Sequence, residues 1–554
     1  MEFRLTEPRR SWLLSGGEIV AAITLIGLGL RLYTIGSESL WLDEGFSVLA
    51  AKRPLRDIWF FVRATDVHPP LYYMILHFWI GWFGDSETAL RMLSAIIGTL
   101  SLPLMYGLGR DLTDRKTAGL ATLMAAISVY HIYFAQEVRG YSLFAFLALL
   151  SMIFWIRLVS RPGFGTGAGY VASTVLTLYS HPYGVFHVAC QNAMFVVLWF
   201  RGRPLRLGWP GWVGMQSLLG LAFSPWIMTT LRKVGMVQEG QTHLRIPSIW
   251  DIPGVLKAFA GDADFIATGS GERFWMGGLF VLLMIAGLLP IRRGMNSRSV
   301  EGGNRREESP VQQQGVVLVT VWLACMILIP FIVSVLVAPV FSNRYMLSGS
   351  FAFLLLVARG IRQISWRPPQ LAVGIGILLL EVWLLVPYYI QVNKEQWRQA
   401  AAWVESRVRQ GDLLLFHAPY CRSCVYWYYA KPKEGVVYAA YPSRSRPSAV
   451  NPKTIREELF PILESRDRVY LVLAHSFDKE GLIRNALDQE FVCTDQQDFY
   501  RVKVSLHQRR DKVPSSAVQK ESKSPTPAVL PGSDLRISSA AGTICSGVCR
   551  SKSP

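Results

Sequence analysis

Two adjacent carboxylates, Asp43 and Glu44, stand in the stretch ESLWLDEGFSVLAAKRPLRDIWFFVRATDVHPPLYY, which separates the first apolar segment of the chain from the next. A carboxylate with an ordinary pKa of about 3.9 is ionised at neutral pH, so it can take a proton from an attacking hydroxyl group. The same pair could instead form interfacial ion pairs with Lys52 or Arg53. The stretch is therefore a candidate general-base site, with an ion pair as the alternative.

Other polar side chains stand at the ends of apolar segments farther along the chain. The candidate binding residues among them are His68, Tyr72, Arg91, Glu137, Arg139, Tyr141, His181, Arg344 and Tyr345. Ionisable groups in such places are costly unless they are paired or functional, and a convergent set predicts a polar cavity. Three have plainer interpretations, since His68 before Pro-Pro could begin a helix, and Arg139 and Arg344 could contact lipid head groups.

The composition indicates which kind of protein must position these residues. The chain has 554 residues, of which 51% are hydrophobic and only 17% charged, and its mean hydropathy is +0.27. Its net charge of +18 comes from Lys and Arg gathered in short loops between apolar segments, which is typical of membrane topology and not of nucleic-acid binding. We therefore expect a multi-pass membrane protein that contacts lipids and no nucleic acid.

Eleven apolar segments are long enough to cross a bilayer, which takes about 20 residues. They centre near residues 26, 100, 125, 149, 174, 193, 220, 282, 326, 354 and 380. A twelfth, at 69–84, is only 16 residues long and opens with two prolines. If it does not span, the basic loops all fall on one side, so the positive-inside rule predicts about eleven transmembrane helices, N-terminus in and C-terminus out. Segment 69–84 is then an interfacial helix of the first outer loop.

After the last apolar segment the composition becomes that of a soluble protein. GDLLLFHA and RVYLVLAH are typical of buried parallel strands, and QWRQAAAWVESRVRQ and EGLIRNALDQ of amphipathic helices. We expect a mostly α membrane domain at 1–392, a small extracytoplasmic α/β domain at 393–503 that helps select the acceptor, and a disordered tail at 504–554. Cys421 and Cys424 could be free thiols or a local disulfide, and no metal site is predicted because ligand spacing is lacking.

Five motifs in order carry a resemblance to a known family: LWLDEGFSV, HPPLYY, ALRMLSAIIG, YFAQEVRGYSL and NRYMLSGSFAFLLL. Across residues 15–390 the sequence resembles membrane glycosyltransferases related to protein O-mannosyltransferases and to the aminoarabinose transferase of lipid A. The resemblance implies a C-type glycosyltransferase fold and a sugar donor carried on a polyprenyl phosphate. The chain contains no Asn-x-Ser/Thr sequon, which favours the plasma (inner) membrane. The resemblance implies no nucleotide cofactor, and it leaves open both a divalent metal and the acceptor, which could be lipid, protein or glycan.

The resemblance also assigns roles to residues. The aspartate of the family's DE pair is the base, which implies this role for Asp43, while Glu44 positions the loop or the acceptor. The donor phosphate needs cations, and those on the expected face are His68, Arg91, Arg139 and Arg344. Direct displacement would invert the anomeric centre. The alternatives are an oligosaccharide polymerase or ligase with a diphosphate-linked donor, and a transporter, for which internal repeats would be expected.

Overall fold

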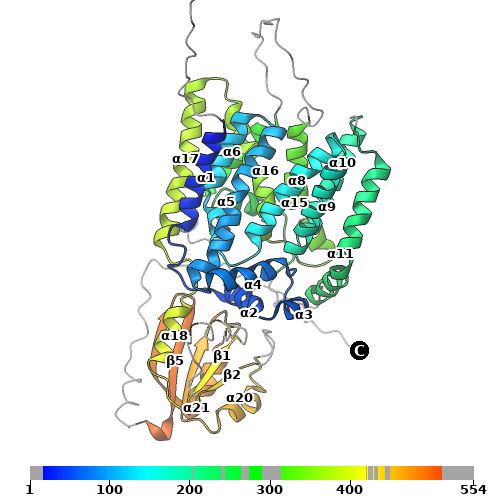
Figure 1. Cartoon of the computed structure of the whole chain (residues 1–554). Helices are drawn as coiled ribbons and strands as arrows, with labels where there is room; N and C mark the ends of the chain where they lie inside the picture. Colours follow the sequence, from blue (N-terminus) through cyan, green and yellow to red (C-terminus); the bar gives the residue numbers. More distant parts are fainter. Residues whose placement is uncertain are drawn as a thin grey trace, which may run out of the picture.

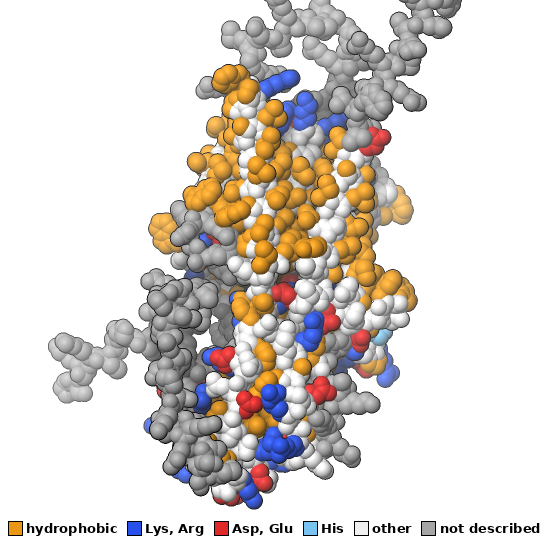
Figure 2. Space-filling model, turned by 90° about the vertical axis from the view of Figure 1, so that its left-hand side faces the viewer, with side chains coloured by type: hydrophobic (Ala, Val, Ile, Leu, Met, Phe, Trp, Pro, Cys, Tyr) orange, Lys and Arg blue, Asp and Glu red, His pale blue; other side chains and the backbone are white. Residues whose placement is uncertain are grey.

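Long apolar helices form a bundle, and a small α/β unit lies beyond one end of it (Figure 1). The computed structural model describes residues 16–202, 205–238, 244–263, 274–289, 314–418, 421, 424, 428, 435–442, 450–478 and 480–513. Hydrophobic side chains cover the face of the bundle in Figure 2, whereas Lys, Arg, Asp and Glu are scattered over the C-terminal unit. The apolar band suits a lipid environment.

Each of the eleven predicted apolar segments is a helix. These helices are α1 Gly16–Leu32, α5 Glu87–Leu112, α6 Arg115–Ile127, α8 Tyr141–Ser160, α9 Phe164–Ser180, α10 Gly184–Phe200, α11 Trp209–Gln238, α13 Phe274–Leu288, α15 Gly315–Leu336, α16 Leu347–Arg362 and α17 Arg367–Ile390. By length and composition, five described helices could cross a membrane, or six when α6 and α7 (Val129–Ala135), bent by 57°, count as one. The mostly helical membrane fold is confirmed, while eleven spans and the N-in orientation stay predictions.

Three short helices lie across the end of the bundle that faces the C-terminal unit (Figure 1). They are α2 Leu42–Ala51, α3 Leu55–Thr65 and α4 Leu71–Phe83. Prolines precede α3 and α4, where their missing N–H groups cost no helical hydrogen bond. The helix expected at 69–84 is therefore present as α4, and its place at a membrane surface stays a prediction.

The C-terminal unit is a five-stranded sheet in the order β2-β1-β3-β5-β4. Its strands are β1 Leu413–His417, β2 Val437–Ala440, β3 Arg468–Leu473, β4 Phe491–Phe499 and β5 Val502–Arg509, and its helices are α18 Trp397–Glu405, α20 Ile455–Leu463 and α21 Leu482–Glu490. The predicted parallel pairing of β1 with β3 is confirmed. Strand β5 buries Val502, Val504 and Leu506 and runs to Arg509. It therefore crosses the boundary predicted at residue 503, and 514–554 lie outside the described residues.

The described bundle also contains the short elements α12 Asp251–Phe259 and η1 Asn343–Met346, and in the C-terminal unit η4 Arg510–Lys512 follows β5. Helix α2 is packed from both sides. Val48 belongs to a core that also contains residues of α3, α4 and α5, while Leu42 packs against the core of the C-terminal unit, of which Trp397 and Leu414 are members. Helix α2, which carries Asp43 and Glu44, is thus fixed between the bundle and the α/β unit.

Candidate active site

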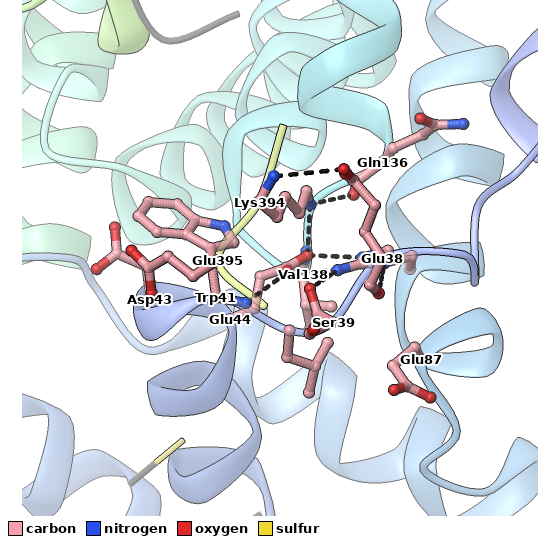
Figure 3. Close-up of polar contacts among 12 residues, drawn as sticks. Glu38, Ser39, Trp41, Asp43, Glu44, Glu87, Gln136, Val138, Lys394 and Glu395 are labelled. Carbon is pink, nitrogen blue, oxygen red and sulfur yellow. Dashed lines mark hydrogen bonds and ion pairs between the residues drawn. The ribbon is translucent and has the colours of Figure 1, made fainter. Parts of the chain in front are cut away.

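Glu44 lies at the centre of a buried polar cluster. Its carboxylate accepts hydrogen bonds from Arg91 Nε at 2.9 Å and Nη2 at 2.7 Å, from Lys394 Nζ at 3.0 Å, and from the backbone N–H groups of Val138 at 2.9 Å and Trp41 at 3.2 Å. The side chain is fully buried. Figure 3 shows it pointing into the cluster, toward Val138. The cluster joins α2, α5, the loop before α8 and the segment after α17.

These donors set the charge of Glu44. Burial raises the pKa of a carboxyl group, but here the charges of Arg91 and Lys394 and the bonds from Arg91 and Val138 outweigh burial and lower the pKa to about 2. Glu44 is therefore ionised at neutral pH, and five donors occupy its oxygens. This arrangement fits a positioning residue and gives Glu44 little capacity to accept a further proton.

Arg91 is equally saturated. Besides its two bonds to Glu44, its guanidinium donates to the backbone carbonyls of Ile35 at 3.0 Å, Glu38 at 2.8 Å and Ser39 at 2.8 Å. All five guanidinium N–H groups are thus used inside the protein. The sequence predicted Arg91 as a phosphate ligand, whereas the structure gives it the position of an anchor for the loop that precedes α2.

Asp43 has different surroundings although it is the next residue. Its side chain is half-buried and in Figure 3 it points away from the Glu44 cluster. Within the described residues, no hydrogen bond or ion pair reaches its carboxylate. Arg139, Arg344 and Tyr345 lie within electrostatic reach of it. A carboxylate in this position can take a proton from a bound group.

A second polar cluster lies beside Asp43 and is built on Arg139. Arg139 Nη1 donates to Tyr73 Oη at 3.1 Å and Nη2 lies 3.0 Å from His68 Nδ1. Asp66 accepts from the Tyr73 hydroxyl and lies 3.1 Å from the same His68 nitrogen. Burial raises the pKa of Asp66, but His68, Arg139 and Tyr73 outweigh it and hold this pKa well below its usual range. Asp66 therefore fixes His68 and Tyr73.

Aromatic rings and imidazoles line the neighbouring space. The ring centre of His181 lies 5.0 Å from that of His68 and 5.0 Å from that of Tyr345, and Tyr141 stacks on Tyr345 at 6.2 Å. His181 Nδ1 accepts from the backbone N–H of Tyr183 at 3.1 Å, so the proton of a neutral ring is on Nε2. Burial lowers the pKa of His181. Among the described residues, Nε2 of His68 and Nε2 of His181 have no hydrogen-bond partner.

The remaining predicted residues divide between these clusters. Tyr72 Oη lies 3.0 Å from Ser94 Oγ, so it contacts protein and not open space. Burial is the main cause that raises the pKa of Glu137 to about 7, and the guanidinium of Arg344 lies 5.4 Å above the ring of Trp41. All eleven predicted site residues thus gather at the end of the bundle that carries α2, but Arg91, Glu44 and Tyr72 hold structural positions.

Sequence reasoning missed two charged members of the site, Lys394 and Asp66. Lys394 is a lysine that follows directly after an apolar helix, on the side that the predicted topology places outside, where the positive-inside rule expects few basic residues. That exception was the available signal. Asp66 stands two residues before His68 in the same polar stretch. Within the described part of the chain, no three His, Cys, Asp or Glu side chains gather in a way that could hold a metal ion.

An apolar groove of about 890 Å³ lies between α9 and α11. Its α9 wall includes Phe164, Ala168, Ala172 and Leu176. Helix α9 continues past this wall to Ser180. The next residue is His181, so one helix leads from the groove to the aromatic rings and imidazoles beside Asp43.

Comparisons with known proteins agree with this fold. Residues 67–228 match the family described as dolichyl-phosphate-mannose-protein mannosyltransferase. An uncharacterized protein of Aquifex aeolicus (strain VF5) is 28% identical over 163 residues, which are 28% of this chain and 33% of that protein. The match thus spans about a third of that relative's length. The family segment contains His68, Arg91, Arg139 and His181 and begins after Asp43.

Solved structures extend the similarity to most of the chain. ArnT from Cupriavidus metallidurans bound to undecaprenyl phosphate has a TM-score of 0.57 at 11% identity, covering 89% of this chain and 98% of that one. The apo form of the same protein has a TM-score of 0.56, covering 88% and 98%. At this identity the similarity shows a shared fold, and it includes the C-terminal region as well as the bundle.

Proposed function

We propose that the chain is a membrane glycosyltransferase of the C type, which transfers a sugar from a polyprenyl phosphate to an acceptor hydroxyl with Asp43 as the base. The observation that carries this proposal is the contrast on α2, where Glu44 is saturated with donors and Asp43 faces cations without a described partner of its own. One carboxylate suffices for the chemistry. A phosphate leaves as a stable anion, so the strong general acid of glycoside hydrolases is dispensable.

The donor phosphate has a suitable set of ligands on the Asp43 side. Arg139 and Arg344 supply charge, and the Nε2 atoms of His68 and His181 supply hydrogen bonds. Charged donors of this kind stabilise the negative charge that grows on a departing phosphate. Attack by the hydroxyl on the anomeric carbon opposite the phosphate inverts the configuration there.

The apolar groove between α9 and α11 is our choice for the polyprenyl tail. It is lined by side chains without charge, such as Val171, Met215 and Leu218. Because α9 leads from this wall to His181, a tail in the groove would end beside the proposed phosphate site. The proposal also places the reaction at the outer face of the membrane, on the same side as the C-terminal unit.

Purified protein in lipid nanodiscs, incubated with a panel of polyprenyl-phosphate sugars, tests the proposal. We expect release of free polyprenyl phosphate from one class of sugar, and transfer with inversion by NMR of the product. The same panel with a chelator decides metal dependence. Release of polyprenyl diphosphate from a diphosphate-linked donor, with none from the monophosphates, would contradict the proposal.

A further inference from the structure

Four consecutive residues after α17, which we call the strap (393–396), connect α2 and its preceding loop to the C-terminal unit. Each strap residue bonds a different partner: Asn393 N with Glu38 Oε1 at 2.5 Å, Lys394 with Glu44 at 3.0 Å, Glu395 with His475, and Gln396 Oε1 with Tyr500 N at 2.9 Å. The first two tie the strap to the acidic stretch, and the last two tie it to loops at the sheet edge. The strap therefore holds the C-terminal unit against the candidate active site.

His475 has an unusual backbone conformation for its residue type. It follows β3 with φ +49, in the left-handed region that side chains with a Cβ rarely adopt. Such a conformation persists where the surroundings over-determine it, and it is concentrated at functional sites. Here the imidazole Nε2 bonds Glu395, whose carboxylate is buried and also accepts from Trp397 Nε1. The ring is thus held in place at the edge of the sheet.

Three charged groups on three different elements act electrostatically on this imidazole, and one of them, Glu395, also bonds it. They are Glu395 of the strap, Asp43 of α2 and Arg501 of the turn between β4 and β5. Burial acts to lower the pKa of His475, but the bond and charge of Glu395, with Asp43 in addition, outweigh burial and the opposing Arg501 and raise this pKa. The side chain is 36% exposed, so its proton can exchange with water.

We propose that His475 is a positioning residue of the active site, supplied by the C-terminal unit and held by Glu395, whose imidazolium attracts the Asp43 carboxylate through its charge and so favours the position in which Asp43 takes the proton. This inference rests on the proposed function. In the step it assists, the acceptor O–H bond breaks and its proton goes to Asp43, the acceptor oxygen bonds the anomeric carbon, and the bond from that carbon to the phosphate oxygen breaks. His475 itself forms and breaks no covalent bond. Glu395 acts indirectly, because its carboxylate bonds the His475 imidazole and holds it in place.

The pH dependence of donor turnover tests this role. The readout is single-turnover release of polyprenyl phosphate in native membrane vesicles, which supply the acceptor. Because the proposed form of His475 is protonated, the parental rate should fall as pH rises through its raised pKa. Glu395→Gln removes the anion that raises this pKa, so its alkaline fall should begin at lower pH. His475→Gln should turn over about 10-fold more slowly and lose that alkaline fall.

A matched control is His507→Gln, because His507 is a histidine of the same sheet that bonds Ser505 and lies 3.8 Å from Asp488. It should keep the parental pH profile, and donor affinity should stay parental in all three variants. A parental profile in His475→Gln and Glu395→Gln, with Asp43→Asn inactive, would overturn the inference and leave the proposed function standing. Parental transfer by Asp43→Asn would instead overturn the proposed function itself.

Discussion

The two faces of helix α2 carry adjacent carboxylates with opposite surroundings. On the inner face, Glu44 is buried and bonded by Arg91, Lys394 and two backbone N–H groups. On the outer face, Asp43 is half-buried and lies within electrostatic reach of Arg139 and Arg344. The difference shows that the role of a carboxylate depends on how many hydrogen bonds it already accepts from the protein. One acid stabilises the site, and the other is the acid that we propose as the base.

The largest expected effect is on the inner face, in Glu44→Gln. Removing the charge leaves Arg91 and Lys394 buried without their anion, which costs about 3–5 kcal/mol of stability. The melting temperature in nanodiscs should fall strongly, and the expression yield with it. Asp43→Asn is the matched control in the same assay, since it should melt like the parent. A parental melting temperature for Glu44→Gln would remove the contrast between the two faces.

The stability that Glu44 contributes should also depend on pH, and it should decrease as the pH falls. The pKa of Glu44 is lowered from 4.5 to about 2 in the folded protein. Its stabilisation is therefore full above pH 4.5 and is lost as pH falls toward 2. The parental melting temperature should drop across this window, and Glu44→Gln should show a smaller drop.

On the outer face, Asp43→Asn should act on rate alone. The amide keeps the shape but cannot accept the proton, so single-turnover transfer should fall by about 100-fold or more. Donor affinity and melting temperature should stay near parental values. Transfer at the parental rate would mean that Asp43 is part of an interfacial ion pair and not the base.

The cations facing Asp43 sharpen the comparison further. Arg139→Ala and Arg344→Ala remove charge from the proposed phosphate site, so at least one should weaken donor binding by about 10-fold, equivalent to about 1.4 kcal/mol. Turnover should fall with it. The measurement is equilibrium binding of the polyprenyl-phosphate sugar to each variant. Parental affinity in both variants would show that the donor phosphate binds elsewhere.

The smallest effect is expected in the apolar groove. Ala172→Trp places an indole in the wall between α9 and α11, so the KM for a long-chain donor should rise by about 3-fold, near the loss of one methylene's burial. A short-chain donor should be unaffected, and this difference between chain lengths is the measurement. Equal effects on both donors would indicate a distorted helix instead of a blocked tail site.

Much of the helical architecture could be predicted because apolar length is a local property of the sequence. Each predicted segment became a helix, and the short segment behind two prolines became α4. The location of the site was likewise visible in motifs such as AQEVRGYS. The saturation of Arg91 was not, since three of its acceptors are carbonyl groups at Ile35, Glu38 and Ser39. Every residue type has a backbone carbonyl, so the sequence does not indicate which carbonyls bond Arg91. That depends on the path of the loop before α2.

Contacts between distant segments were missed for a related reason. Glu44 and Lys394 are 350 positions apart, and nothing local in either segment names the other as its partner. The end of the C-terminal unit was misplaced because VKVSLHQR contains Lys, Ser and Gln, which resembles the tail by composition. Its pairing with β3 and β4 supplies the order that composition cannot indicate.

The bond between Lys394 and Glu44 also determines when the protein can be finished during its synthesis. A ribosome adding roughly 5–20 residues per second makes the lysine about 20–70 s after the glutamate. Until then the Glu44 carboxylate on α2 has Arg91 but lacks Lys394, the second of its two cations, although most of the membrane bundle has been made. The acidic stretch near the start of the chain is therefore completed by the last connection out of the bundle, and a nascent chain that stops before residue 394 cannot close its site.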